Sequence, residues 1–361
     1  RKGWLCHNSL AVSFPHREVL GLASQILHRR AAAPAQESMK SRRERTTRES
    51  RLWLEGTKAL PASRQLVDVC DRGADTFEFL EHEVHSGRTF VIRSAYNRGA
   101  VPKHGSTMRR GLLHDLVREA PALGQWTLSV PAARLVKKPR QTGQDKIIHR
   151  PKHDAVVQVA ALPVEICLPC DKSGDYGTEA LQLWIVRVWE GQPPLGAEPM
   201  EWLLLTNHPV ESFQAAWDVV GWYECRWIIE EYHKAQKTGC GIENPQFTTS
   251  GRLHAMIALL SVVALSLLNL RELSRRAEAK TRLATDIIAE DYVCLLSLWR
   301  RGRAIPQWSI HDFCMALARL GGHLNRKHVH DPGWIVLWRG WTQLQLMMEG
   351  ANAVRKMKKC A

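Results

Sequence analysis

The chain has 361 residues, and its 50 Lys and Arg against 36 Asp and Glu leave a net charge of +14. That length suits two or three domains, and a composition of 45% apolar and 24% charged residues excludes a chain that is disordered throughout. The positive charge favours an anionic partner, of which nucleic acid is the commonest. A basic surface that only keeps the protein soluble would give the same net charge.

Cysteine usage and apolar runs indicate the compartment. Nine cysteines at irregular spacing are typical of a reduced, intracellular protein. Cys167 and Cys170 form a lone CxxC with no matching second pair, which disfavours zinc. Leu253–Leu270 is apolar but interrupted by polar residues, so we predict a core helix and no membrane association. Residues 1–16 show no signal-peptide pattern.

The first elements are predicted to be a strand and a basic segment. Trp4–Ser13 alternates in the manner of a strand, and Ala31–Ala35 is typical of a linker. Lys40–Arg51 is strongly basic and is predicted to continue as a helix to Gly56. This run is either a solvated helix face or a DNA contact.

A βαβ unit follows. Gln65–Cys70 and Thr89–Ser94 are predicted strands, and the helix between them is expected to be capped by Asp75, with Glu78 in a capping box, and to end at Gly87. Because a strand, a helix and a strand fit within about thirty residues, the two strands should be parallel neighbours.

The pattern then becomes β-rich. Between the first two strands of this region, Arg134–His153 carries seven Lys and Arg against one Asp. It is either a hairpin tip that follows a phosphate backbone or a solvated loop. The predicted strands are Gln125–Val130, Ala155–Ala161, Leu181–Trp189 and Trp202–Thr206.

Everything after Pro209 is predicted to be helical. The first helix runs to about Lys237 and breaks at Gly239; further helices are expected near 252–276, 280–300 and 309–321, with a last one from Trp334. The last helix has an apolar face that fits a core or an interface equally well. Its residues are Trp334, Leu337, Trp338, Trp341, Leu344 and Met348.

Chemistry-bearing residues gather on the helix after Pro209. Five of them share one helical stripe at 3.6 residues per turn, namely Tyr223, Arg226, Glu230, Lys234 and Lys237. Such a stripe is usually a solvated ladder of ion pairs. Asp71, at the carboxyl end of a βαβ strand, stands where sites in open α/β sheets form. Together with Glu230 it could hold divalent metal for phosphodiester chemistry.

These residues carry a resemblance. Val69–Asp75 is similar to the second-aspartate segment of bacterial DDE transposases of the insertion-sequence-four family, and Tyr223, Arg226, Glu230 and Lys237 match that family's Tyr-Arg-Glu-Lys signature in type and spacing. Further close matches occur elsewhere. They are Trp202–Thr206, Ala318–Gly322 and Trp334–Trp341.

The resemblance implies a fold and a domain plan. The fold is α/β, with an RNase H-like catalytic core that is incomplete at its N-terminal strand, a β-rich insertion and an all-α dimerisation domain. Residues 1–120 would form the first part of the core and 121–208 the insertion. Residues 209–276 would supply the catalytic helix and the next helix of the core, and 277–361 the dimerisation domain.

The resemblance also implies roles for single residues. Asp71 corresponds to the second catalytic carboxylate and Glu230 to the third, both ligands of a two-metal site for Mg²⁺ or Mn²⁺. Trp202 matches a tryptophan that helps to hold a flipped base, although the residues alone suggest a core Trp. The DNA-gripping positions are Arg93, Tyr223, Arg226, Lys234 and Lys237.

The implied activity is cut-and-paste DNA transposition, in which ends are cleaved, form hairpins and join target DNA by in-line phosphoryl transfer. The implied partners are double-stranded DNA, at transposon ends and target, and a second copy bound through residues of about 280–361. The expected location is the bacterial cytoplasm, on the nucleoid when DNA is bound.

One part of the family pattern is not found in the sequence. The family's first catalytic Asp and its end-recognition domain precede the segment that Trp4–Ser13 matches, so we expect that the chain begins inside a longer reading frame or has been processed. We expect that this polypeptide alone does not transpose. The alternatives are a non-catalytic DNA-binding and dimerising remnant that inhibits a full-length partner, and a stand-alone RNase H-like nuclease.

Overall fold

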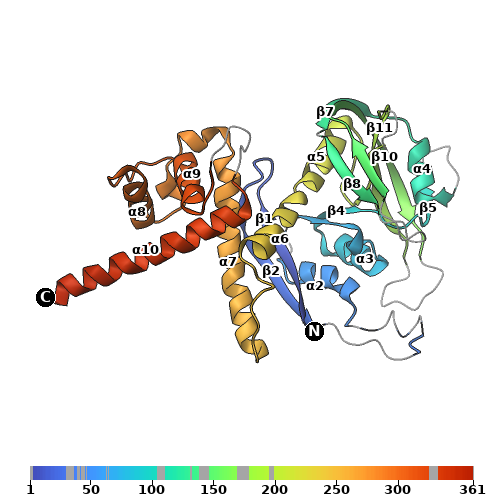
Figure 1. Ribbon diagram of the computed structural model, residues 1–361. Helices are drawn as coiled ribbons and strands as arrows, with labels where there is room; N and C mark the ends of the chain where they lie inside the picture. Colours follow the sequence, from blue (N-terminus) through green and yellow to red (C-terminus); the bar gives the residue numbers. More distant parts are fainter. Residues whose placement is uncertain are drawn as a thin grey trace. The chain divides into compact units, whose positions relative to one another are not determined.

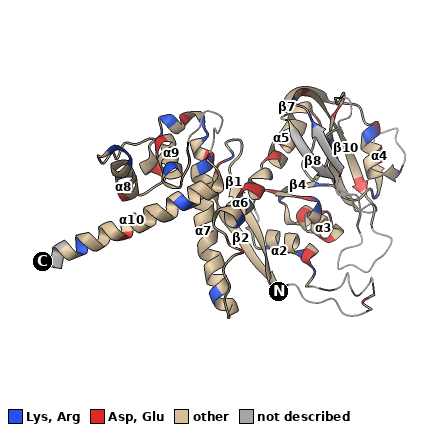
Figure 2. Ribbon diagram, in the orientation of Figure 1, with Lys and Arg blue, Asp and Glu red and all other residues tan. Residues whose placement is uncertain are grey.

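The computed structural model describes residues 3–29, 36–38, 41, 45, 47–61, 63, 65–103, 110–130, 132–137, 146–168, 179–194, 199–324 and 332–360. The chain divides into two compact units (Figure 1). Unit 1 comprises residues 1–7 and 26–226, and unit 2 comprises residues 8–25 and 227–361. Lys and Arg are spread over both units rather than confined to one stretch of either (Figure 2).

Unit 1 is built around one sheet of eight strands. Strands β3 and β4 are parallel and the other neighbours are antiparallel, so the chain is of the mixed α/β class. Strand β7 (Gly124–Val130) pairs with β10 beside the main path. The main path runs β3 (Val67–Cys70), β4 (Thr89–Arg93), β12 (Glu201–Thr206), β11 (Leu181–Glu190), β10 (His153–Ile166), β5 (Gly99–Pro102) and β6 (Gly111–Leu112).

The predicted βαβ unit is confirmed, with β3 and β4 in parallel register on either side of helix α3 (Phe77–Ser86). Gly87 ends the helix in the left-handed region, at φ +71°. The predicted cap is wrong. Thr76, not Asp75, caps α3 by accepting a hydrogen bond from the Phe79 amide, and Glu78 pairs with Arg48 at 3.2 Å instead of closing a capping box.

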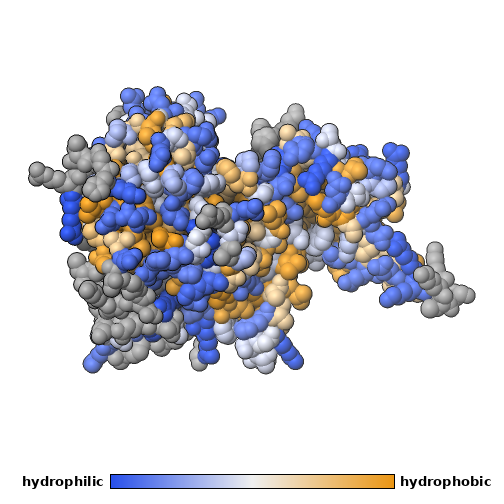
Figure 3. Space-filling view, turned by 180° about the vertical axis from the view of Figure 1, so that it is seen from behind, coloured by the Kyte–Doolittle hydropathy of each residue, from blue (hydrophilic) through white to orange (hydrophobic). Residues whose placement is uncertain are grey.

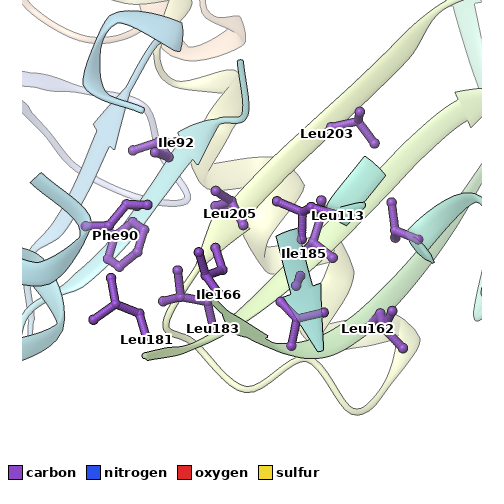
Figure 4. Close-up of a cluster of buried hydrophobic side chains, with 14 of the residues drawn as sticks. Phe90, Ile92, Leu113, Leu162, Ile166, Leu181, Leu183, Ile185, Leu203 and Leu205 are labelled. Atoms are coloured by element: carbon purple, nitrogen blue, oxygen red, sulfur yellow. The ribbon is translucent and has the colours of Figure 1, made fainter. Parts of the chain in front are cut away.

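Both faces of the sheet are covered by apolar packing. Phe90 and Ile92 of β4 point into a cluster with α2 (Leu52–Lys58), α3 and α4 (Leu113–Glu119), part of which Figure 4 shows. Val91 points the other way, into a cluster with α5 (Phe213–Glu224). This alternation is the period of two that a strand imposes on its side chains. The sheet is therefore buried on both faces along β4.

Two hairpins lie outside the eight-stranded sheet. Strands β1 (Trp4–Val12) and β2 (Val19–Arg29) form one, and β8 (Ala133–Lys137) with β9 (Lys146–Arg150) form the other. Strand β1 confirms the first predicted strand. The predicted linker, the tip between β8 and β9 and much of the basic segment before η1 (Glu49–Arg51) lie outside the described residues.

Unit 2 is helical apart from its share of the β1–β2 hairpin. The first predicted helix is interrupted. The stretch predicted near 280–300 is helical only in its second half, and its first half forms short 3₁₀ turns. The other predicted helices are confirmed. In order, the elements are α6 (Trp227–Lys234), the π-helical η3 (Ala235–Gly239), α7 (Ser250–Ser274), η4 (Ala277–Lys280), η5 (Ala284–Asp286), α8 (Glu290–Arg301), α9 (Ile310–Leu320) and α10 (Trp334–Cys360).

Helix α7 is half core helix and half surface. Ile257, Ala264 and Leu267 are buried in unit 2, whereas Leu259 and Val262 are exposed. Among the described residues it is the one helix long and apolar enough to cross a membrane, and 33% of its most apolar window is buried. Exposed apolar side chains also occur elsewhere on the surface (Figure 3).

The Trp-rich face of α10 packs inside unit 2. Trp334, Leu337, Leu344 and Met348 are buried there, against α9 and neighbouring segments. The face that fitted a core or an interface equally well is therefore a core face. Residues 352–357 are exposed, and this end of the helix extends away from the rest of unit 2 (Figure 1).

Seven cysteines whose side chains the structure describes are thiols and not disulfides. Burial raises the pKa of Cys240 to about 12, so that thiol stays protonated and unreactive at neutral pH. Cys170 lies outside the described residues, so the structure does not describe the CxxC pair.

A buried pair of carboxyl groups lies between α2, β3 and α3. The Thr57 hydroxyl lies 2.7 Å from Glu83 Oε1 and close to Asp68 Oδ2, but it has one proton to donate. Burial, and then the Asp68 charge, raise the pKa of Glu83 to about 7. Arg88 lies 3.5 Å from Asp68 and 3.8 Å from Glu83. Glu83 therefore keeps its proton below about pH 7, and Arg88 faces both carboxyl groups.

This pair makes stability pH-dependent. Because the pKa of Glu83 is raised in the folded state, its contribution is fully present below the unfolded pKa and is lost as the pH rises through about 7. We expect Glu83→Gln to raise the free energy of unfolding at pH 8 by on the order of 1–3 kcal/mol and to leave it nearly unchanged at pH 5. Urea unfolding at both pH values measures this, with the exposed Glu119→Gln as control. An equal effect at both pH values would contradict it.

Candidate functional site

Asp71 directly follows β3, at the carboxyl end of that strand. Its Oδ1 accepts a hydrogen bond of 2.8 Å from the Gly73 amide, which fixes a tight 3₁₀ turn. A Cβ at Gly73 would come within 2.3 Å of the Trp53 ring, so only glycine allows this turn to lie against α2. The carboxylate is exposed, and its second oxygen has no hydrogen-bond partner among the described residues.

Strand register places three predicted residues on one face of the sheet. Arg93 pairs with Leu204, and Trp202 lies two residues before Leu204, so both side chains point the same way. Val69 pairs with Val91, and Asp71 and Arg93 are each two residues further along. Asp71, Arg93 and Trp202 therefore belong to the face that α5 covers.

The end of α5 brings two more predicted residues to this face. The Tyr223 ring meets the Trp202 ring edge to face, at a centroid distance of 5.3 Å. The Arg226 guanidinium lies 5.9 Å from the centroid of the Tyr223 ring. Arg93 and Arg226 both interact electrostatically with the Tyr223 hydroxyl. We call Asp71, Arg93, Trp202, Tyr223 and Arg226 the sheet-edge cluster.

Positive charge dominates the sheet-edge cluster. Burial, and then the nearby Arg72, lower the pKa of Arg93, and Arg226 acts in the same direction. Burial raises the pKa of Tyr223, which Arg226 and Arg93 partly oppose. Guanidinium groups crowded in this way are stabilised by an anion, so the cluster is suited to hold a phosphate oxygen.

Residues that the sequence reasoning missed support the cluster. Arg93 Nη2 donates to the Glu201 carbonyl at 3.1 Å. The Glu201 carboxylate accepts from Arg118 at 2.7 Å and from Arg187 at 2.9 Å, and the Arg118 hydrogen bond is the largest cause that lowers the pKa of Glu201. The sequence feature that could have indicated Glu201 is its position directly before Trp202, at the start of a predicted strand. These contacts anchor the segment that presents Trp202.

Asp75 is a structural residue. It is fully buried, and its Oδ2 accepts from the amides of Ala95 at 2.6 Å and Tyr96 at 3.0 Å. Its Oδ1 pairs closely with Arg98. A carboxylate occupied in this way braces the chain as it leaves β4 and has no free oxygen for a metal.

The other three predicted residues belong to unit 2. Glu230 is half-buried on α6. Lys234 forms an ion pair of 2.5 Å with Glu231 and lies 5.5 Å from the Trp227 ring, and Lys237 pairs with Glu243 at 3.2 Å. Lys234 and Lys237 are both exposed.

The prediction of one continuous helical stripe from Tyr223 to Lys237 is wrong. Helix α5 ends at Glu224, because the amides of Cys225 and Arg226 bond to carbonyls three residues back. After α6 the chain forms a π-turn, in which the Cys240 amide donates to the Ala235 carbonyl at 2.7 Å. The five residues therefore do not share a single helix face.

A buried polar network explains the π-turn. Gln236 Nε2 donates to Ser261 Oγ at 2.9 Å and to the Tyr232 hydroxyl at 3.1 Å. Gln25 Nε2 donates to Asn8 Oδ1 at 2.9 Å and to the same Ser261 Oγ at 2.8 Å. The network ties the β1–β2 hairpin to α7, and the extra residue of the π-turn points Gln236 inward while Lys237 stays exposed.

The carboxylates are chemically suited to a hard cation. Mg²⁺ and Mn²⁺ prefer oxygen ligands, and Asp71 and Glu230 each have a carboxylate that is not fully buried. Within the described part of the chain, no group of three or more His, Cys, Asp or Glu side chains is placed to hold a metal. The fit therefore rests on the type of ligand alone.

The five residues of the sheet-edge cluster come from four segments, at the ends of β3, β4 and α5 and the start of β12, and belong to one face of unit 1. Their chemistry combines one carboxylate with open oxygen, two guanidinium groups and two aromatic rings. This set can bind a phosphodiester and stack an unpaired base. No protein-family model matches the chain.

Proposed function

We propose that the chain is a DDE-type DNA transposase whose catalytic core is RNase H-like. The observation that carries the proposal is the sheet-edge cluster. Asp71 comes from one of the two motifs that resemble the insertion-sequence-four family, and Tyr223 and Arg226 come from the other, about 150 residues later. Their meeting on one face of unit 1 supports a shared role for the two motifs.

The substrate is double-stranded DNA. Arg93 and Arg226 would hold backbone phosphates, and Trp202 would stack a base turned out of the duplex. Lys234 and Lys237 of unit 2 would add phosphate contacts. The net charge of +14 supports such a partner and predicts a strong dependence of binding on salt.

Asp71 and Glu230 would hold Mg²⁺ or Mn²⁺. When bound, the metal supplies activation of a water and stabilisation of the leaving oxygen of a phosphodiester. The open oxygen of Asp71 suits this role, and the arginines beside it would neutralise the phosphate. The non-catalytic remnant would bind DNA in the same cluster and would lack the metal.

DNA binding tests the cluster. We expect Arg93→Gln and Arg226→Gln each to weaken the binding of a short duplex by about three- to tenfold and to reduce the salt slope by about one. Fluorescence anisotropy over a salt series measures both quantities. Lys58→Gln, which removes one exposed cation of α2, is the control and should have a much smaller effect. Losses equal to that of the control would contradict a specific phosphate site.

A measurement of metal binding distinguishes the proposed transposase from the alternative of a non-catalytic remnant. Loss of an outer-shell partner alone costs about tenfold or more in metal affinity, so we expect Asp71→Asn and Glu230→Gln each to weaken Mn²⁺ binding at least as much. Electron paramagnetic resonance titration of the full chain measures free Mn²⁺. The control is Asp154→Asn, an exposed carboxylate of β10. Affinity unchanged in either variant would argue against a shared site and in favour of the remnant.

The proposal includes a homodimer formed through the C-terminal helices. Because the Trp-rich face is packed inside unit 2, the available surface is the exposed stripe of Leu346, Val354 and Met357 on α10. We expect Leu346→Glu to convert dimer to monomer in sedimentation velocity, and the exposed Leu298→Glu on α8 to leave the dimer intact. A wild-type chain that sediments as a monomer would contradict the dimer.

A further inference from the structure

Unit 2 contains a pocket of about 100 Å³ between the end of α8 and one side of α9. Its walls include three arginines, one carboxylate, one histidine and an indole. These residues are Arg300, Arg301, Arg319, Asp312, His323 and Trp308. Arg319 lies in the Ala318–Gly322 match, but none of the six belongs to the two motifs on which the proposed function rests.

The three guanidinium groups outnumber the carboxylates that line the pocket, since Asp312 is the one acidic residue of its lining. Among the described residues, no carboxylate lies within ion-pairing distance of Arg300, Arg301 or Arg319. Asp312 lines the same pocket, but its Oδ2 accepts from Ser309 Oγ at 2.9 Å and its amide donates to that hydroxyl, so it serves the cap of α9. Three cations against one engaged carboxylate leave a net positive pocket that favours an anion.

His323 gives the pocket a second, independent signal. Its side chain is 8% exposed, and its Nε2 is buried without a hydrogen-bond partner among the described residues. A buried polar nitrogen without a partner is costly, and a ligand oxygen would remove that cost. The described chain therefore leaves one ring nitrogen of a pocket-lining residue without a hydrogen-bond partner.

The position of His323 is fixed by the backbone. Its amide donates to the Ala318 carbonyl at 2.9 Å, and Gly322 before it has a φ of +95°. A Cβ at Gly321 would lie 1.8 Å from the Val336 carbonyl oxygen, so glycine is required for the turn to lie against α10. The imidazole is thus held in place before any ligand arrives.

We propose that this pocket binds a phosphate group. Its volume is about that of three water molecules, which suits one tetrahedral oxyanion. Guanidinium forks match the oxygens of phosphate, and the buried Trp308 limits water on one side. The phosphate belongs either to a small phosphorylated molecule or to a nucleic-acid backbone, and the inference does not depend on the proposed transposase activity.

Binding of inorganic phosphate to the full chain tests the pocket. By isothermal titration calorimetry we expect Arg319→Gln and His323→Leu each to weaken binding about tenfold, as for the loss of a charge-assisted hydrogen bond. His323→Gln keeps a side-chain donor and should retain more affinity than His323→Leu. Arg303→Gln removes an exposed arginine of the α8–α9 loop outside the pocket and should bind phosphate as the wild type does.

A second titration identifies the source of the phosphate. If duplex DNA binds Arg319→Gln more weakly than Arg303→Gln, the phosphate belongs to a nucleic acid. If the two variants bind DNA equally while Arg319→Gln has lost inorganic phosphate, it belongs to a small molecule. Either result supports the pocket. Absence of phosphate binding by the wild type, or equal binding by Arg319→Gln, which alters an exposed side chain and should fold, would overturn the proposal.

Discussion

The register of three strands is the constraint on which the sheet-edge cluster depends. Strand β4 is parallel to β3 and antiparallel to β12, so the ends of β3 and β4 and the start of β12 meet at one edge. Side chains then alternate between the faces, which sends Asp71, Arg93 and Trp202 toward α5. A slip of one residue in β4 would turn Arg93 into the apolar cluster around Phe90 and Ile92, where an unpaired guanidinium is strongly disfavoured.

Local signals in the sequence were sufficient for the elements of this edge. The βαβ unit, most strands of unit 1 and most helices follow from alternation, length and breakers such as Gly87. The interrupted helix did not follow, because its π-turn depends on Gln236 reaching Ser261 and the β1–β2 hairpin. The pairing of β10 with β5 likewise depends on partners distant in the chain. Of the candidate site, the residue types were predictable. The helical stripe was not, since α5 ends at Glu224, and neither were supports such as Glu201.

Buried polar groups in this chain follow two different rules. Glu83 lies next to Asp68 with one shared hydroxyl donor, and a retained proton removes the conflict. Gln236 and Ser261 are neutral and are satisfied by several hydrogen bonds within unit 2. The first arrangement responds to pH and the second does not. The proposed phosphate pocket differs from both, because His323 Nε2 has no hydrogen-bond partner among the described residues.

The burial of Asp75 has a practical consequence for genetics. Asp75 stands four residues after Asp71 in the same motif, and a random screen would recover both as loss-of-function positions. Removal of the Asp75 carboxylate leaves the amides of Ala95 and Tyr96 and the Arg98 side chain without their acceptor. Such mutants would fail through low protein abundance, because a destabilised chain is degraded. Immunoblots beside the activity screen would therefore separate a residue that shapes the protein from one with the proposed role on DNA.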